Sequence, residues 1–128
     1  MEENIDRWIV MFTGPIVGEH DYMLNINVAG KQIPIGSTLE DFCKRGEQQQ
    51  KKEFPDYVKV QEYSTTIGQL PAVVQIFTAT VRGFPIKDKQ AIVIKGRVAY
   101  IITYDVTTDC HDEYLDCFEC VINSFKFD

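Results

Sequence analysis

Residues that could do chemistry gather near the C-terminus, in the stretch DCHDEYLDCFEC at 109–120. This stretch contains three of the four cysteines, one of the two histidines and five carboxylates. Thiolates, imidazoles and carboxylates are the protein ligands of zinc, and a thiol beside a base can act as a nucleophile or a redox centre. Three alternatives follow: a metal site, a reactive thiol, or an ordinary helix whose cysteines belong to the core.

Helical periodicity accounts for the spacing of these residues. At about 100° per residue, Cys110 and Cys117 fall on an apolar surface, and most of the acidic residues fall on the opposite side. The rest of that surface comprises Tyr114, Leu115, Phe118, Val121 and Ile122, with His111 in line at its N-terminal end. Buried cysteines commonly pack as small apolar residues. The pattern predicts a core helix over about 108–123, with Cys120 at its margin as an exposed thiol.

The metal and redox alternatives fit the spacing less well. A tetrahedral zinc site needs four converging ligands, and Cys117-x-x-Cys120 has no second pair at zinc-finger spacing. A redox Cys-x-x-Cys lies at the start of a helix, where the dipole lowers the thiol pKa, whereas this one lies near the end. His111 faces a different stripe from Cys120, which disfavours a thiol–imidazole pair. We expect reduced thiols, no catalytic residue and no cofactor.

Two loops carry polar or aromatic side chains that could make contacts. The loop TGPIVGEHD contains Glu19, His20 and Asp21, a set of donors that could hold a divalent ion or a partner. The turn RGFP places Phe84 at its tip, where the ring either anchors a partner or folds back onto the sheet. Both loops are better explained as structural connections between strands.

Charge and length exclude several classes of function. The chain has 128 residues, of which 13 are basic and 19 acidic, and its formal net charge is −6. Binding to nucleic acid or to an anionic membrane requires a basic surface, so neither is expected. No apolar run approaches the about 20 residues that span a bilayer, and the polar opening MEENIDRW is unlike a signal peptide. We expect a cytoplasmic protein, or an exported or lipid-anchored one if a leader precedes this sequence.

The N-terminal half of the chain predicts two strands and a helix. A strand over 7–12 is expected to end at the turn signal Gly14-Pro15. The alternation in 21–28 predicts a strand with apolar residues on one face and Asn25 and Asn27 on a wet face. The segment 36–54 is helical in pattern. Ser37 and Glu40 form an expected capping box, and Pro55 ends the helix.

The C-terminal half predicts a strand-rich meander within a single domain that covers 1–128. The expected strands, joined by short turns with Gly or Pro, are 57–66, 72–81, 86–95 and 97–106. Such short connections require antiparallel neighbours, because parallel strands need long crossovers. The cysteine-rich helix follows as the last element.

This order of elements resembles the PsbP-like family, which includes the photosystem II extrinsic protein and bacterial DcrB-type proteins. The resemblance runs over about 8–127 and rests on VMFTGP, LNINV, STLEDF, LPAVVQIFTAT, KGRVAYIITYDV and YLDCFECVINSFKF in this order. It implies an α+β fold, an α/β/α sandwich around a central antiparallel sheet. Only Trp8 echoes the segment that usually forms the first strand of the family, so that strand is expected to be missing or cut short before Trp8.

The resemblance implies an accessory or binding protein and supplies no catalytic motif. We therefore expect a non-enzymatic domain that contacts a protein partner through the sheet edge or the two loops. The alternative is a protein that binds a small ligand or a divalent metal through Glu19, His20 and Asp21. A third hypothesis, an enzyme with a thiol nucleophile, requires one cysteine with a lowered pKa.

Overall fold

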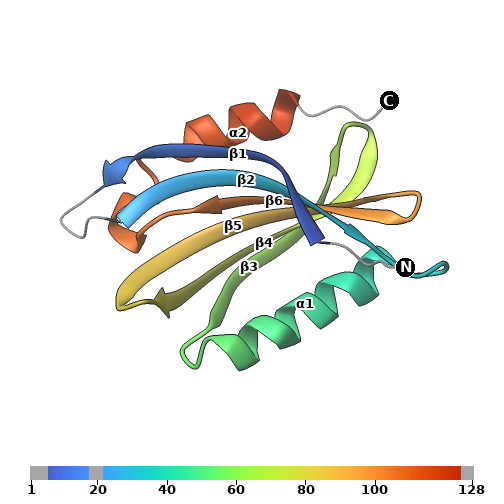
Figure 1. Cartoon of the computed structure of the whole chain (residues 1–128), viewed down its shortest axis with the longest axis horizontal. Coiled ribbons are helices and arrows are strands. Elements are labelled where there is room, and N and C mark those ends of the chain that lie inside the picture. Colours follow the sequence, from blue (N-terminus) through green and yellow to red (C-terminus); the bar gives the residue numbers. More distant parts are fainter. Residues whose placement is uncertain (1–5, 18–21, 125–128) are drawn as a thin grey trace.

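A six-stranded antiparallel sheet lies at the centre of the computed structural model, which describes residues 6–17 and 22–124, with side chains from 25 to 124. The strand order is β1-β2-β6-β5-β4-β3. The strands are β1 (Asp6–Val17), β2 (Tyr22–Gln32), β3 (Val58–Ile67), β4 (Leu70–Val81), β5 (Phe84–Lys95) and β6 (Val98–Asp105). Helix α1 (Leu39–Glu53) covers one face and α2 (Leu115–Ser124) covers the other (Figure 1). The expected α/β/α sandwich is confirmed.

The predicted meander is also confirmed, because β3, β4, β5 and β6 are sequential antiparallel neighbours. Two-residue turns join them. At the β4–β5 turn both Arg82 and Gly83 have positive φ, +51° and +85°. Two successive positive φ values define the type I′ turn, whose twist matches that of a hairpin. Arg82 therefore adopts a positive φ, which is uncommon for a non-glycine residue, because the type I′ turn requires positive φ at that position.

The prediction that the first strand ends in a turn at Gly14-Pro15 is wrong. Strand β1 continues to Val17, and its register with β2 shifts between Thr13 and Ile16. Proline has no N–H for a ladder hydrogen bond, so within sheets it is confined to edge strands and bulges. Because β1 is an edge strand, the Gly-Pro pair produces a bulge there and does not end the strand.

Helix α1 occupies the predicted segment, but its N-cap is one residue later than expected. The Thr38 side chain accepts a hydrogen bond from the Asp41 N–H at 3.0 Å. Ser37 does not cap because the first helical residue is Leu39, which makes Thr38 the flanking position. The helix ends at Glu53, and Phe54 is its C-cap directly before Pro55, as predicted.

The sheet face under α2 is dry and apolar. Its buried side chains interdigitate with Phe118 of α2, which is fully buried and stacks on Tyr104 with ring centroids 5.4 Å apart. The sheet contributes Ile26, Val28, Ala72, Val74, Ala91, Val93 and Ile102. Burial of each large apolar side chain contributes roughly 1.5–3 kcal/mol, so this face holds the main core.

The opposite face of β2 is not wet, contrary to expectation. Asn27 is only 7% exposed and Asn25 is half-buried. The Asn27 Nδ2 donates to Asn25 Oδ1 at 2.7 Å, and the Asn25 Nδ2 donates to Asp105 Oδ2 at 3.2 Å. The two asparagines are therefore part of a buried polar network, which the alternating pattern alone does not distinguish from a solvated face.

The C-terminal helix starts later than predicted. Residues Thr108–Cys110 form a 3-10 turn, and α2 begins at Leu115. In a continuous helix the His111 carbonyl would accept from the Leu115 N–H. Here the Tyr104 hydroxyl donates to that carbonyl at 2.6 Å, and Leu115 N–H bonds to Asp112. The Tyr104 hydroxyl from β6 thus bonds to the His111 carbonyl that a longer helix would use as an acceptor.

This break changes the surroundings of the cysteines. Cys110 is buried as predicted, but Cys117 is exposed and not part of the core. A helical wheel is valid only along an unbroken helix, so Cys110 and Cys117 no longer share a stripe. Cys120 is exposed, as expected. Phe84 is half-buried and packs against Phe77 and its neighbours, so its ring folds back onto the sheet.

Replacement of Tyr104 with Phe should destabilise the protein by about 1–3 kcal/mol, because it leaves the buried His111 carbonyl without its donor while the ring remains in place. Urea unfolding monitored by circular dichroism measures this loss. An unchanged midpoint would show that the carbonyl finds another donor and that Tyr104 does not set the start of α2.

Candidate functional site

The structure separates the residues that the sequence singled out. Glu19, His20 and Asp21 lie outside the described residues, so their role in ion or partner binding stays a prediction. His111 is 3% exposed, and its Nδ1 lies 2.9 Å from the Lys87 carbonyl oxygen. Because a carbonyl can only accept, Nδ1 carries a proton and donates it to the backbone. This bond holds His111 in a structural position.

The four cysteines are free thiols and lie in different environments. Cys43 and Cys110 are buried, whereas Cys117 and Cys120 are exposed. No group of three or more His, Cys, Asp and Glu side chains within 25–124 could hold a metal ion. Burial, reinforced by the nearby charge of Glu62, raises the pKa of Cys43 to about 11. Its thiol is therefore protonated near neutral pH, which is the opposite of an activated nucleophile.

The sheet face under α1 differs from the core face because polar side chains occupy the middle of its strands. The Asp88 carboxyl group is buried in hydrogen-bonding contact with that of Asp105. Two carboxyl groups in contact must share a proton. Burial, followed by the charge of Asp105, raises the pKa of Asp88 well above its usual range. The α1 face thus contains a buried carboxyl group with a raised pKa as well as the asparagine network of β2.

A groove of about 450 Å³ lies between α1 and β3. Its apolar surface comes from Leu39 and Cys43 of α1 and from Val73 of β4. Helix α1 supplies these groups on one side because its apolar residues recur at helical spacing, while β3 forms the opposite wall with Glu62 and Ser64. The groove is therefore bounded by a helix and by the outermost strand of the sheet.

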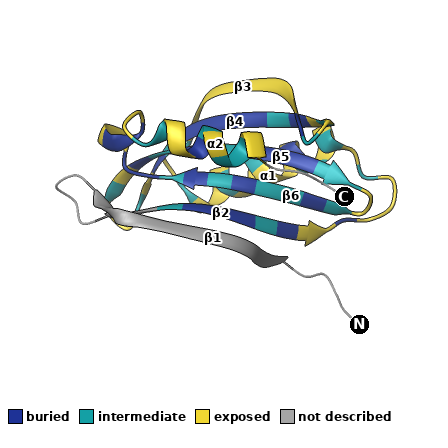
Figure 2. Ribbon diagram, turned by 90° about the horizontal axis from the view of Figure 1, so that it is seen from above, coloured by how far each residue is buried: buried dark blue, intermediate teal, exposed yellow. Residues whose placement is uncertain are grey.

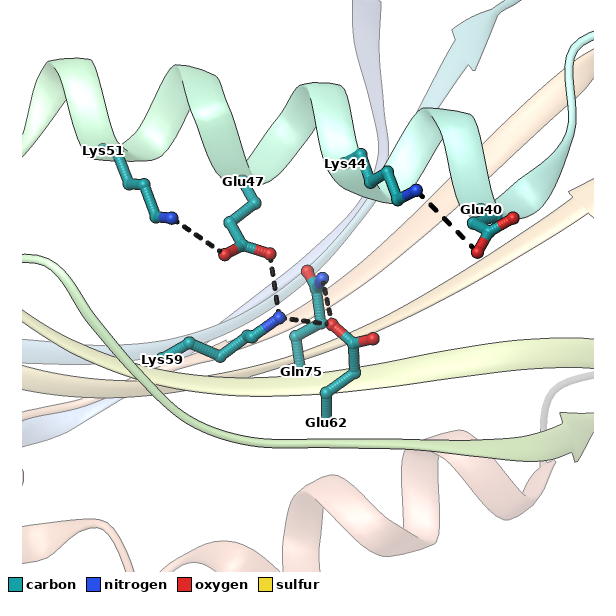
Figure 3. Close-up of polar contacts among 7 residues, drawn as sticks. All are labelled: Glu40, Lys44, Glu47, Lys51, Lys59, Glu62 and Gln75. Carbon is teal, nitrogen blue, oxygen red and sulfur yellow. Dashed lines mark hydrogen bonds and ion pairs between the residues drawn. The ribbon is translucent and has the colours of Figure 1, made fainter.

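Ion pairs connect the two walls of the groove (Figure 3). The Lys59 Nζ lies 2.9 Å from Glu47 Oε1 of α1 and 2.9 Å from Glu62 Oε1 of β3. Glu62 also accepts from the Gln75 amide at 3.0 Å, and Glu47 pairs with Lys51 at 3.3 Å. These contacts fix the distance between helix and strand at one end of the groove.

The ion pairs also set the charge state of the groove. The hydrogen bond from Lys59 lowers the pKa of Glu62, with a further contribution from Gln75, and it also lowers that of Glu47. The hydrogen bonds to Glu62 and then to Glu47 raise the pKa of Lys59. All three groups are charged over the physiological range, so the pairs persist there.

Strand β3 is the outermost strand on this side and pairs only with β4 among the described strands. Nine of its ten residues are exposed (Figure 2). Its register with β4 is regular from Gln61 to Ile67, after a shift between Lys59 and Gln61. An edge strand presents unpaired N–H and C=O groups along its outer side. Seven residues of β3 therefore form an open pairing edge beside the groove.

A second, larger cavity of about 610 Å³ lies between α1 and the sheet, toward β2 and β6. Gln75 lines both cavities. These sites are difficult to predict from the sequence, because each combines side chains of α1 with side chains of two or more strands. One signal was present: Gln75 is a single amide within the mainly apolar run AVVQIF, where a polar side chain needs a partner.

Comparison with protein families identifies the chain. The family model DcrB matches residues 9–124, which is nearly the whole sequence. The chain belongs to the DcrB family. Membership confirms the resemblance to PsbP-like and DcrB-type proteins. A comparison of the sequence with curated proteins finds no match.

Solved structures share the fold of this DcrB-family chain at low sequence identity. PA94, a protein of unknown function from Pseudomonas aeruginosa, has a TM-score of 0.84 at 12% identity over 100% of this chain and 86% of that chain. Cyanobacterial PsbP (CyanoP) from Synechocystis has a TM-score of 0.64 at 14% identity, over 92% and 82%. LpqN of Mycobacterium tuberculosis, involved in cell envelope biogenesis, has a TM-score of 0.58 at 12% identity, over 96% and 82%. Within the described residues, neither helix is long and apolar enough to cross a membrane.

Replacement of Asp88 with Asn should make the protein increasingly more stable than the unaltered protein as pH rises above about 3.8. Because the folded-state pKa of Asp88 is raised, the folded protein holds a proton that the unfolded chain releases, and stability falls with rising pH until the folded carboxyl ionises. Asn has no such proton. Urea unfolding at a series of pH values measures the difference.

The Asp56→Asn variant is a control whose stability, relative to the unaltered protein, should change with pH in the opposite direction. Hydrogen bonds from Thr80 to its carboxylate lower the pKa of Asp56, so the Asp56→Asn variant should lose stability relative to the unaltered protein as pH rises. If the stability difference for Asp88→Asn does not vary with pH, Asp88 does not hold its proton in the folded state.

Proposed function

We propose that this DcrB-family chain is a non-enzymatic binding domain that takes an extended segment of a partner protein along the outer edge of β3, beside α1. The observation that carries this proposal is the open edge of β3 next to the helix-bounded groove. Addition of a strand to a sheet edge uses main-chain hydrogen bonds for affinity and pockets for alternate side chains for specificity. Both parts are present at this edge.

The main-chain part of the contact is the regular segment of β3 from Gln61 to Ile67. A strand laid against it would extend the antiparallel meander by one neighbour at the usual spacing of about 4.8 Å. The register shift beyond Lys59 makes the adjoining part of the edge less regular, which limits the length that a partner can pair. The partner segment is therefore about seven residues long.

The side-chain part of the contact is the groove. Glu62 and Ser64 point to the α1 side, so alternate side chains of an added strand would enter the space beside Leu39 and Cys43. The acidic and basic groups at the rim are paired with one another, and they comprise Lys44, Lys51 and Lys59 with Glu40, Glu47 and Glu62. Because these charges balance, we expect a partner segment with apolar residues at alternate positions and no strong charge preference.

Replacement of Ser64 with Phe tests the proposal, because the new ring would occupy the groove at the pairing edge. A binding peptide is first selected from a library of random linear peptides. We expect Ser64→Phe to weaken its binding at least about tenfold, which corresponds to about 1.4 kcal/mol, as measured by fluorescence anisotropy. Thr66→Phe is the matched control, since Thr66 lies on the same strand and face but does not line the groove.

Amide hydrogen exchange identifies the contact directly. Bound peptide should slow exchange of β3 amides that are unpaired in the free protein. Peptides that bind without protecting β3, or that bind Ser64→Phe as well as the unaltered chain, would contradict the proposal. Sedimentation of the chain alone tests whether a second copy occupies the edge. If the chain forms a dimer and Ser64→Phe abolishes it, the strand added at β3 belongs to a second copy of this chain and not to a different partner protein.

A further inference from the structure

The sheet under the larger cavity, the cavity under α1, presents two different rows of side chains. Cross-strand partners lie side by side on one face of a sheet. The apolar row on β2, β6 and β5 comprises Ala29, Ile101 and Ile92, which all line the cavity. The polar row lies two residues further along the same strands, about 7 Å away on the same face. It comprises Asn27, Thr103, Gln90 and Gln75, of which the two glutamines line the cavity.

Helix α1 repeats this division on the opposite side of the cavity. Phe42 lies near the start of α1 and Gln50 near its end, eight residues or about 12 Å apart along the helix, and both line the cavity. The Gln50 Nε2 donates to Gln90 Oε1 at 3.2 Å, which fixes this part of the helix over the polar row. The apolar row is nearer the end of β2, from which the chain enters α1. The cavity therefore has an apolar end toward Phe42 and an amide end at Gln50.

Charged side chains lie only at the margin of this cavity among the described residues. Arg45 is exposed on α1, and Lys31 is exposed on β2, where it lies opposite Asp6 of β1. The other lining side chains of 25–124 are amides and apolar groups without charge. A charged ligand buried among them would lose its hydration and gain no counter-charge, which is unfavourable. The lining therefore suits a neutral molecule.

The amides of the cavity retain hydrogen-bonding capacity. A carboxamide has two N–H donors and an oxygen acceptor. The Gln90 Nε2 donates to Thr103 Oγ1 at 3.4 Å, and the Gln75 Nε2 donates to Glu62 at 3.0 Å (Figure 3). Within residues 25–124, no group donates to the Oε1 atoms of Gln50 and Gln75, although Gln75 is only 2% exposed. A molecule in the cavity that carries both donors and an acceptor would complete these bonds.

We propose that the cavity under α1 binds a small neutral molecule with a carboxamide- or urea-type head group and an apolar body. The head exchanges hydrogen bonds with the amides of Gln50, Gln75 and Gln90, and the body lies on the apolar row beneath Phe42. The volume of about 610 Å³ falls within the range of about 300–1,000 Å³ typical of small-molecule sites. This site goes beyond the proposed strand-binding edge and does not depend on it.

Three probes with eight-carbon chains test the choice of head group. Octanamide is neutral, octanoate is an anion and octylammonium is a cation. Each is titrated into the ¹⁵N-labelled protein, and nuclear magnetic resonance follows the side-chain amide groups of the glutamines. We expect octanamide to shift the resonances of Gln50 and Gln90 saturably, with a Kd at least about tenfold below that of either charged probe. A charged probe that binds as tightly as octanamide would overturn the proposal.

The Gln50→Leu variant tests the amide end of the cavity. It should weaken octanamide binding about threefold to tenfold, because it removes a hydrogen-bonding group and keeps a side chain of similar size. Gln48→Leu is the matched control, since Gln48 is exposed on the same helix and does not line the cavity. Its Kd for octanamide should equal that of the unaltered protein. If the two variants bind octanamide equally well, the amide end does not hold the head group.

The Ala29→Leu variant tests the apolar end, because the larger side chain extends from the apolar row into the cavity. It should abolish octanamide binding while circular dichroism shows an intact fold. A folded Ala29→Leu protein that binds octanamide normally would contradict the proposed site. Ser64→Phe fills the groove beside β3 and should leave octanamide binding unchanged. Loss of octanamide binding in Ser64→Phe would place the probe in that groove and overturn the proposal, whereas the peptide experiment would be unaffected.

Discussion

The path of the chain between β2 and β3 is the constraint on which the rest of the structure depends. Strand β2 pairs with β6, and the meander places β5 and β4 between β6 and β3. The chain that leaves β2 must therefore cross to the opposite edge of the sheet, a lateral distance of about 19 Å over four strand spacings. Helix α1 has 15 residues and a length of about 22 Å, which is sufficient for this crossing.

This crossing gives the two faces of the sheet different chemistry. Helix α2 lies on its face as a cover, with Phe118 fully buried against Tyr104. Helix α1 is a connection as well as a cover, and Cys43 is its one buried residue. It faces amides and carboxyl groups, several of which bond to one another, and cavities remain between them. The Asp88 Oδ1 and the Tyr57 hydroxyl are buried there without a hydrogen-bond partner among the described residues, and an unpaired buried polar group costs stability.

The sequence predicted those features that depend on local physics. The alternation of apolar and polar residues, together with the short turns, was sufficient to predict the meander. Pro55 and a polar first turn were sufficient to predict α1. The late start of α2 was not predictable, because it depends on a hydroxyl from Tyr104 that bonds to the His111 carbonyl. The open edge of β3 also escaped prediction, since strand order is a property of the whole sheet. The candidate sites also depend on this arrangement, because α1 lines the groove with β3 and β4 and lines the larger cavity with β2, β4, β5 and β6.

The β2–β6 ladder has a further consequence for how the molecule folds. It pairs Asn25 with Asp105 and Gln32 with Val98, whereas the meander joins strands that follow directly in the chain. Closing a long loop costs more entropy than closing a short one, and non-local pairing slows folding. The hairpins of the meander can therefore form first, and the N-terminal hairpin docks afterwards. Because residues 29–34 form one wall of the cavity under α1, that cavity is completed only when the last ladder closes.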